Sequence, residues 1–71
     1  MILISDNHEH IIRDPKHIEI VEVDELGFLI KADGVIMGFT KSYKTAFSEM
    51  EDIANALTKD YRHYQVCSSY E

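Results

Sequence analysis

The most metal-like spacing in the sequence is His8-Glu9-His10. Side chains alternate between the two faces of a β-strand, so on a strand His8 and His10 would offer two imidazole ligands on one side. Two ligands do not close a zinc site, and a further side chain such as His17 or His63 would have to converge on them. We therefore expect a solvated hairpin arm here, with no bound metal and no cofactor.

The carboxylates form two clusters, one before residue 26 and one after residue 48. Paired carboxylates act as acid and base only in a cleft that shifts their pKa values, and a chain this short has little volume for one. We therefore expect a solvated acidic surface that binds a partner, no catalytic residue and no enzymatic activity. The two clusters are Glu19, Glu22, Asp24 and Glu25, and Glu49, Glu51 and Asp52.

Cys67 is the single cysteine, which excludes an internal disulfide and favours a reducing compartment, so we expect a cytoplasmic protein. The apolar stretch at the N-terminus is too short for a signal peptide or a membrane span. Near the other end, Tyr61 and Tyr64 alternate with basic groups and could dock a partner. We favour the simpler interpretation, in which both tyrosines end the apolar stripe of a helix.

The charge of the chain is negative and unevenly distributed. The 71 residues carry 13 acidic and 7 basic side chains, a formal net charge of −6. Residues 1–27 and 45–71 are acidic, whereas residues 28–44 are mildly basic. Because nucleic-acid binding depends on basic groups that displace counterions from phosphates, this balance disfavours a nucleic acid as direct ligand. It favours a protein partner with a basic surface, including one that itself holds nucleic acid.

Short strands must position these groups in the part of the chain before residue 41, where turn residues separate apolar runs. The strongest signal is Asp33-Gly34 between two such runs, typical of a two-residue type I′ turn. That turn places three apolar pairs on one face of a hairpin and a mixed surface on the other. We expect strands at about 2–5, 8–13, 17–24, 28–32 and 35–40. The expected pairs are Ala32–Val35, Ile30–Met37 and Phe28–Phe39 on one face, and Lys31–Ile36 and Leu29–Gly38 on the other.

After Thr40 the apolar period changes from two to nearly four, which predicts a helix with Ser42 as its N-cap. No Gly or Pro ends this pattern, so the helix is expected to run to about residue 59–64. Residues 65–71 show no pattern and are expected to fray. The predicted apolar stripe is Ala46, Phe47, Met50, Ile53, Ala54, Leu57, Tyr61 and Tyr64.

These elements predict an α+β domain over residues 1–64, with an antiparallel sheet of four to five short strands and the C-terminal helix packed on one face. The opposite sheet face, including Leu29 and Ile36, would then be uncovered or covered by a second subunit. The apolar alternation changes phase between Ile20 and Val21. We favour a β-bulge there; the alternative is that both faces of this strand are partly covered, one of them by another chain.

The chain resembles a group of short uncharacterised β-sheet-plus-C-terminal-helix proteins of Gram-positive phages and prophages. The resemblance covers residues 1–57: a strand and polar turn, Ile-Leu-Ile-Ser-Asp-Asn, a Met-Gly-Phe ending of the last strand at residues 37–39, and the apolar stripe of the helix. Asn7 replaces the usual turn glycine, a minor departure because Asn tolerates positive φ. The resemblance implies a mobile-element origin and no chemistry, and it favours an accessory or anti-defence protein that works by binding.

Two function hypotheses follow from the sequence. The first is a non-enzymatic module whose acidic side chains occupy a basic surface of a host nucleic-acid-handling protein. The second is a structural homo-oligomer, such as a homodimer, that associates through the uncovered sheet face or a sheet edge.

Overall fold

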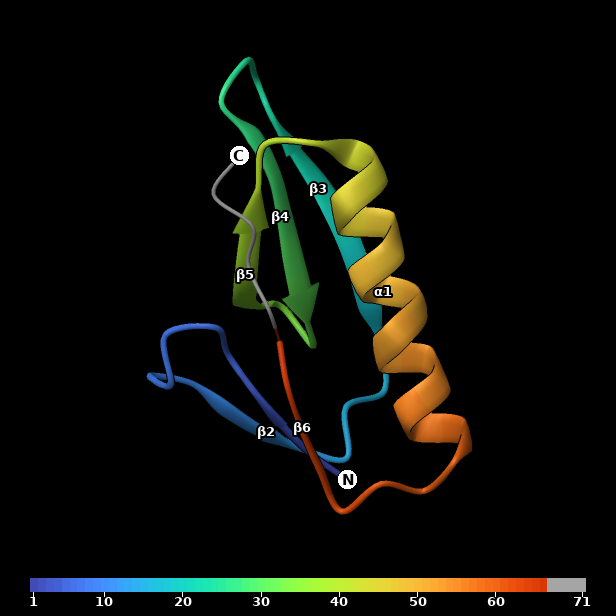
Figure 1. Cartoon of the computed structure of the whole chain (residues 1–71). Coiled ribbons are helices and arrows are strands. Elements are labelled where there is room, and N and C mark those ends of the chain that lie inside the picture. Colours follow the sequence, from blue (N-terminus) through green and yellow to red (C-terminus); the bar gives the residue numbers. More distant parts are fainter. Residues whose placement is uncertain (67–71) are drawn as a thin grey trace.

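The computed structural model describes residues 1–66, which form an α+β fold with one helix and two small sheets (Figure 1). The predicted fold class is confirmed, and the helix begins where the N-cap Ser42 predicts. The elements are β1 (Ile2–Ile4), β2 (Ile11–Arg13), β3 (Ile18–Val23), β4 (Gly27–Ala32), β5 (Val35–Thr40), α1 (Tyr43–Thr58) and β6 (His63–Gln65).

The strands divide into two three-stranded sheets rather than the single antiparallel sheet expected. One has the order β3-β4-β5 and is antiparallel throughout; the other has the order β2-β1-β6, in which β1 and β6 are parallel. A backbone hydrogen bond of 2.9 Å from Asp6 N–H to the carbonyl of Met37 connects the β1–β2 turn to β5.

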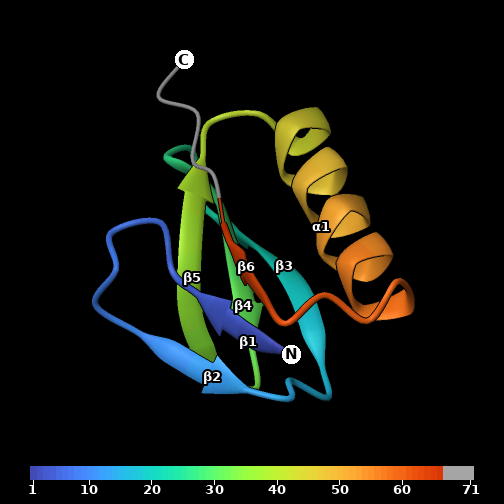
Figure 2. The ribbon, with the colours of Figure 1, turned by 60° about the horizontal axis from the view of Figure 1, so that its bottom comes forward.

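The core lies between one face of β3-β4-β5 and the elements that cover it. Leu3 of β1 and Val66, which follows β6, are fully buried with Ile30 of β4 and Ile53 of α1. The helix and the β1–β6 pair therefore share one face of the larger sheet (Figure 2). The opposite face, called the outer face below, has no described element packed on it.

The Asp33-Gly34 hairpin is confirmed, but its predicted register holds only next to the turn. Both turn residues have positive φ, +50° and +83°, as a type I′ turn requires. A β-bulge then places one extra residue, Met37, in β5 and shifts every later pair by one. Ala32–Val35 and Lys31–Ile36 are therefore correct, whereas the predicted pairs Ile30–Met37, Phe28–Phe39 and Leu29–Gly38 are wrong. The actual pairs are Ile30–Gly38, Leu29–Phe39 and Phe28–Thr40.

In β3 the expected bulge is absent, because its register with β4 is unbroken. Ile18 and Ile20 pack against the core, while Val21 lies opposite Leu29 on the outer face. The favoured bulge is therefore wrong, and β3 carries apolar side chains on both faces; that another chain covers one of these faces stays a prediction.

The helix ends earlier than predicted, in a Schellman motif that uses Asp60 where glycine is usual. Asp60 has a φ of +58°, its N–H donates to Leu57 O, and Tyr61 N–H donates to Ala56 O at 3.0 Å. The chain then forms β6, so the expectation of a frayed tail is wrong for Gln65, which is in that strand, and for the buried Val66. Cys67 and the rest of that tail lie outside the described residues.

The side of the helix that faces the core also differs from the prediction. The buried residues are Ala46, Glu49, Ile53 and Ala56, whereas Phe47, Ala54 and Leu57 are exposed. Tyr61 and Tyr64 lie beyond the helix, and Tyr64 is half-buried in β6. The buried side of the helix thus includes Glu49, which accepts a hydrogen bond from Tyr64 of β6.

Asp33 connects the hairpin turn to the loop before β3. Its Oδ1 accepts hydrogen bonds from Lys16 N–H at 3.1 Å and His17 N–H at 2.9 Å, and its own N–H donates to His17 O at 2.8 Å. The carboxylate therefore satisfies two backbone donors and holds the start of β3 against the turn.

We expect Asp33→Ala to lower the free energy of unfolding by about 1–2 kcal/mol, because it removes the acceptor of two backbone donors and disfavours the positive φ. Asp33→Asn keeps an acceptor oxygen and tolerates that φ, so its loss should be less than half as large. Urea unfolding measures both. Equal losses in the two variants would show that the side-chain hydrogen bonds contribute nothing.

Candidate interaction surface

Glu19 lies on the outer face of β3, where a lysine and a histidine accompany it. Lys31 of β4 is its cross-strand partner, and the Nε2 of His17 lies 3.5 Å from its carboxylate. Opposite charges directly across an antiparallel pair attract each other. The charge of Glu19 is thus partly compensated within the protein.

Three further carboxylates gather at the opposite end of β3 without such compensation. Glu22 is exposed and lies opposite Phe28, while Asp24 and Glu25 are exposed in the turn that leads to β4. Asp24 has a φ of +46°, which Asp tolerates better than most residues. Within residues 1–66, none of these three carboxylates forms an ion pair. They are called the β3-end carboxylates below.

The helix carboxylates separate into exposed and buried positions. Glu51 and Asp52 are exposed, as an acidic surface requires. Glu49 is only 7% exposed, and its Oε1 accepts a hydrogen bond of 2.9 Å from the hydroxyl of Tyr64. The prediction that Glu49 belongs to the partner-binding surface is therefore wrong, because the helix turns this residue toward β6.

We expect Tyr64→Phe to lower the free energy of unfolding by about 1–3 kcal/mol, since it removes a donor from a buried carboxyl oxygen. Glu49→Gln keeps an acceptor oxygen for the hydroxyl and should cost less. Chemical unfolding monitored by circular dichroism measures both variants. If Tyr64→Phe left the free energy of unfolding unchanged, this hydrogen bond would not hold β6 to the helix.

Three aromatic rings lie beside the β3-end carboxylate Glu22. The sequence did not indicate this group. The rings of Phe28 and Tyr43 meet edge to face at a centroid distance of 5.5 Å, and Tyr43 stacks on Phe47 at 6.2 Å. Tyr43 is 55% exposed and Phe47 44%. Tyr43 and Phe47 are four residues apart on the helix, a spacing that could have indicated contact between their rings, but Phe47 was expected in the core. Since Glu22 pairs with Phe28, carboxylates and accessible aromatic rings share this part of the surface.

The predicted oligomer residues Leu29 and Ile36 both lie on the outer face. The registers of β3, β4 and β5 place Val21, Leu29 and Phe39 side by side in one row across the sheet. The neighbouring row is Glu19, Lys31 and Ile36, the last of which is 47% exposed. The bulge after Ile36 completes the apolar row, because it brings Phe39 to this face.

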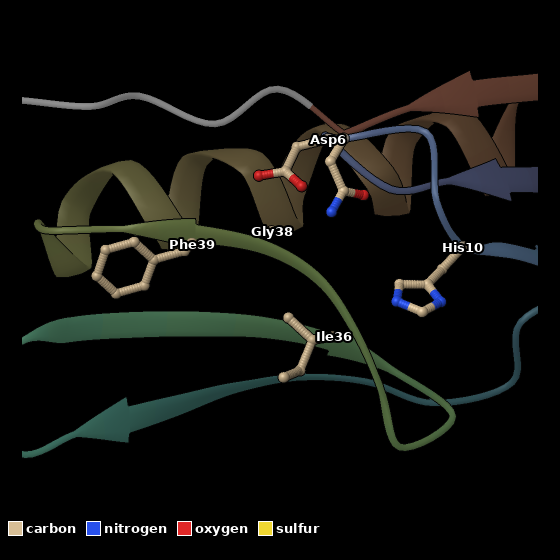
Figure 3. A pocket seen from close by; sticks show the side chains of 6 residues that line it. Asp6, His10, Ile36, Gly38 and Phe39 are labelled. Atoms are coloured by element: carbon tan, nitrogen blue, oxygen red, sulfur yellow. The ribbon is translucent and has the colours of Figure 1, made fainter.

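A hollow of about 320 Å³ lies between the β1–β2 turn and β5. Figure 3 shows Asp6 and His10 on one side of it and Ile36 and Phe39 on the other. Through Ile36 and Phe39 this hollow continues the outer face. Its remaining lining residues are Asn7 and Gly38.

The two histidines of the metal-like spacing lie in this turn, and β2 begins only at Ile11. Both are exposed, and His8 has a φ of +65°, so the alternation of a strand does not bring the two rings to one side. In the part of the chain that the structure describes, no group of three or more His, Cys, Asp or Glu residues could hold a metal ion.

The amino group of Met1 lies 2.7 Å from Oδ1 of Asp14. This hydrogen bond and the positive charge of the amino group hold the pKa of the exposed Asp14 carboxyl below its ordinary value. Asp14 is thereby engaged with the start of β1, away from the β3-end carboxylates.

No family model, curated protein or solved structure matches the chain. Among residues 1–66, no helix has the length and apolar character needed to cross a membrane.

Proposed function

We propose that the protein is a non-enzymatic binding module whose acidic surface occupies a basic surface of a host nucleic-acid-handling protein. The observation that carries this proposal is the exposure of the β3-end carboxylates, Glu22, Asp24 and Glu25, without an ion pair in the described chain. Glu51 and Asp52 add exposed negative charge on the helix.

The aromatic rings beside these carboxylates support the same proposal. Interface centres are enriched in Tyr and Phe, which bury a large area, whereas charges at the rim set orientation and association rate. Glu22 provides the charge, and Tyr43, whose ring contacts that of Phe28 opposite Glu22, provides with Phe47 the aromatic component. A net charge of −6 on 71 residues would steer the protein toward a positive surface.

The resemblance to phage and prophage proteins gives the proposal its setting, an accessory or anti-defence protein in the bacterial cytoplasm. In this setting the partner is a host protein with a patch of Lys and Arg that otherwise faces nucleic acid. The acidic side chains would compete with nucleic acid for that patch.

The test is capture of proteins from a Gram-positive bacterial lysate at low and high salt, followed by their identification. We expect basic nucleic-acid-handling proteins to bind at low salt and to dissociate as salt screens the charges. The double variant Glu22→Gln/Glu25→Gln should lose them. The matched control Glu9→Gln/Asp60→Asn removes the same charge elsewhere and should retain them. Capture of background proteins only, or equal loss in both double variants, would contradict the proposal.

The outer face favours a second candidate function, the structural homo-oligomer. Its row Val21, Leu29 and Phe39 is apolar, and a second copy could cover it. Size-exclusion chromatography with light scattering decides between monomer and dimer, and Leu29→Lys should dissociate a dimer formed through this face. A monomer at high protein concentration would exclude this candidate.

A further inference from the structure

Strand β3 is an edge of the larger sheet, and it is six residues long. Among the described strands only β4 pairs with it. The helix contacts β3, β4 and β5 and runs alongside β3 (Figure 1), but it is not a strand and forms no ladder with the β3 edge. An unpaired edge of this length is a template for another strand.

The register identifies the backbone groups that this edge offers. In an antiparallel ladder, successive residues point their N–H and C=O groups alternately toward and away from the neighbouring strand. His17 O accepts from Asp33 N–H, which assigns the odd-numbered residues of β3 to the side of β4. The N–H and C=O groups of Ile18, Ile20 and Glu22 therefore point outward. In the described chain these three residues have no hydrogen bond at this edge.

The charges along this edge select what can pair with it. Glu19 lies on the outer face beside Lys31, and Glu22 lies on the helix side opposite Phe28. The two carboxylates are three residues apart and hence on opposite faces of the strand. A strand added at this edge can complement both Glu19 and Glu22 if it carries two cationic side chains three residues apart. The residues between them must tolerate apolar neighbours.

We infer that β3 is the recognition strand of the proposed module and that it binds an extended basic segment of the partner protein by strand addition. This inference rests on the proposed function and deepens it. Backbone hydrogen bonds to Ile18, Ile20 and Glu22 supply the affinity, and the partner's Lys or Arg residues opposite Glu19 and Glu22 supply the register. The cation opposite Glu22 extends to the helix side, near Phe28 and the exposed ring of Tyr43.

A second copy of this chain fits the same edge poorly. When two copies of β3 pair in antiparallel fashion about any residue from 19 to 22, one Glu meets the same Glu of the second copy, either directly opposite or at the neighbouring diagonal. Like charges at such positions repel each other, and each chain adds a net charge of −6. A basic segment instead gains attraction in the equivalent register.

The inference can be tested by titrating the ¹⁵N-labelled protein with two capped peptides of equal composition. In Thr-Thr-Lys-Val-Ile-Lys-Thr-Thr the lysines have the spacing of Glu19 and Glu22; in Thr-Lys-Thr-Val-Ile-Thr-Lys-Thr they do not. We expect the first peptide to bind several-fold more tightly. It should also slow amide hydrogen exchange at Ile18, Ile20 and Glu22, whereas residues 19, 21 and 23, already bonded to β4, should change little.

Charge variants complete the test. Glu22→Lys should weaken binding of the first peptide roughly fivefold, and the matched control Glu51→Lys on the helix should change it less than about twofold. Equal binding of the two peptides, no binding, or protection confined to the helix or the outer face would overturn the inference. Should lysate capture persist when the peptides fail, strand addition is wrong and the proposed function stands. Failure of both experiments overturns both.

Discussion

Gly27→Ala is expected to lower the free energy of unfolding by about 3 kcal/mol or more, enough to unfold much of a domain this small. Gly27 begins β4 with a φ of +147°, a conformation that side chains of L-residues rarely adopt. A Cβ at this position would collide with the backbone oxygen of Thr40 and lie 2.8 Å from the ring of Phe39. Thr40 is fully buried, so its backbone has no room to withdraw.

Gly34→Ala is the matched control, because it also places alanine at a positive φ, +83°, but with nothing within 4 Å of the new Cβ. It should cost only about 1 kcal/mol, the conformational part of the penalty. Urea unfolding of both variants separates conformation from collision. Similar losses in the two would mean that the close approach of β4 and β5 at Gly27 is not tight. Gly27→Ala should also disturb Phe39 on the outer face, which amide chemical shifts would report.

The features that the sequence predicts correctly depend on residues close together in the chain. The Asp33-Gly34 turn sets φ > 0 at two adjacent positions, and Ser42 starts the helix where the apolar period changes. The apolar side chains on both faces of β3 are also visible in the sequence, although the favoured bulge was wrong. Leu29 and Ile36 were expected on the uncovered face, where the structure has them.

The features that the sequence did not predict depend on contacts between distant residues. Strand β6 is three residues long and becomes a strand only because β1, at the other end of the chain, offers it a parallel partner. Met37 gives no local sign that it forms a bulge. Glu49 lies in an acidic stretch that looks solvent-exposed, and its burial involves a hydrogen bond from the distant Tyr64.

The same distinction applies to the candidate surface. Glu22, Asp24, Glu25, Glu51 and Asp52 could be placed on an exposed surface from composition and turn position alone. Their association with the aromatic rings of Tyr43 and Phe47 could not, because it requires the rotation of the helix about its axis. The apolar pattern of the helix placed Phe47 in the core, whereas the structure exposes it.

Leu3→Ala is expected to lower the free energy of unfolding by about 2–5 kcal/mol, because it leaves a cavity at the junction of the two sheets. Leu3 is fully buried at the centre of β1, with Ile12 of β2 as its partner on one side and Tyr64 of β6 on the other. It belongs to the same core cluster as Ile30 and Ile53. Leu3, together with Val66, thus packs the small sheet against the large one.

Leu26→Ala removes the same atoms from a side chain that is 69% exposed, so it should change the stability by less than about 0.5 kcal/mol. Hydrogen exchange of Leu3→Ala shows where the structure is lost. If the small sheet docks as a separate cooperative unit, amides of β1 and β6 lose protection first while β4 keeps it, and binding at β3 persists. If all strands lose protection together, the core is one unit and binding declines with folding. If Leu3→Ala left the free energy of unfolding unchanged, the packing of Leu3 between the two sheets would add nothing to stability.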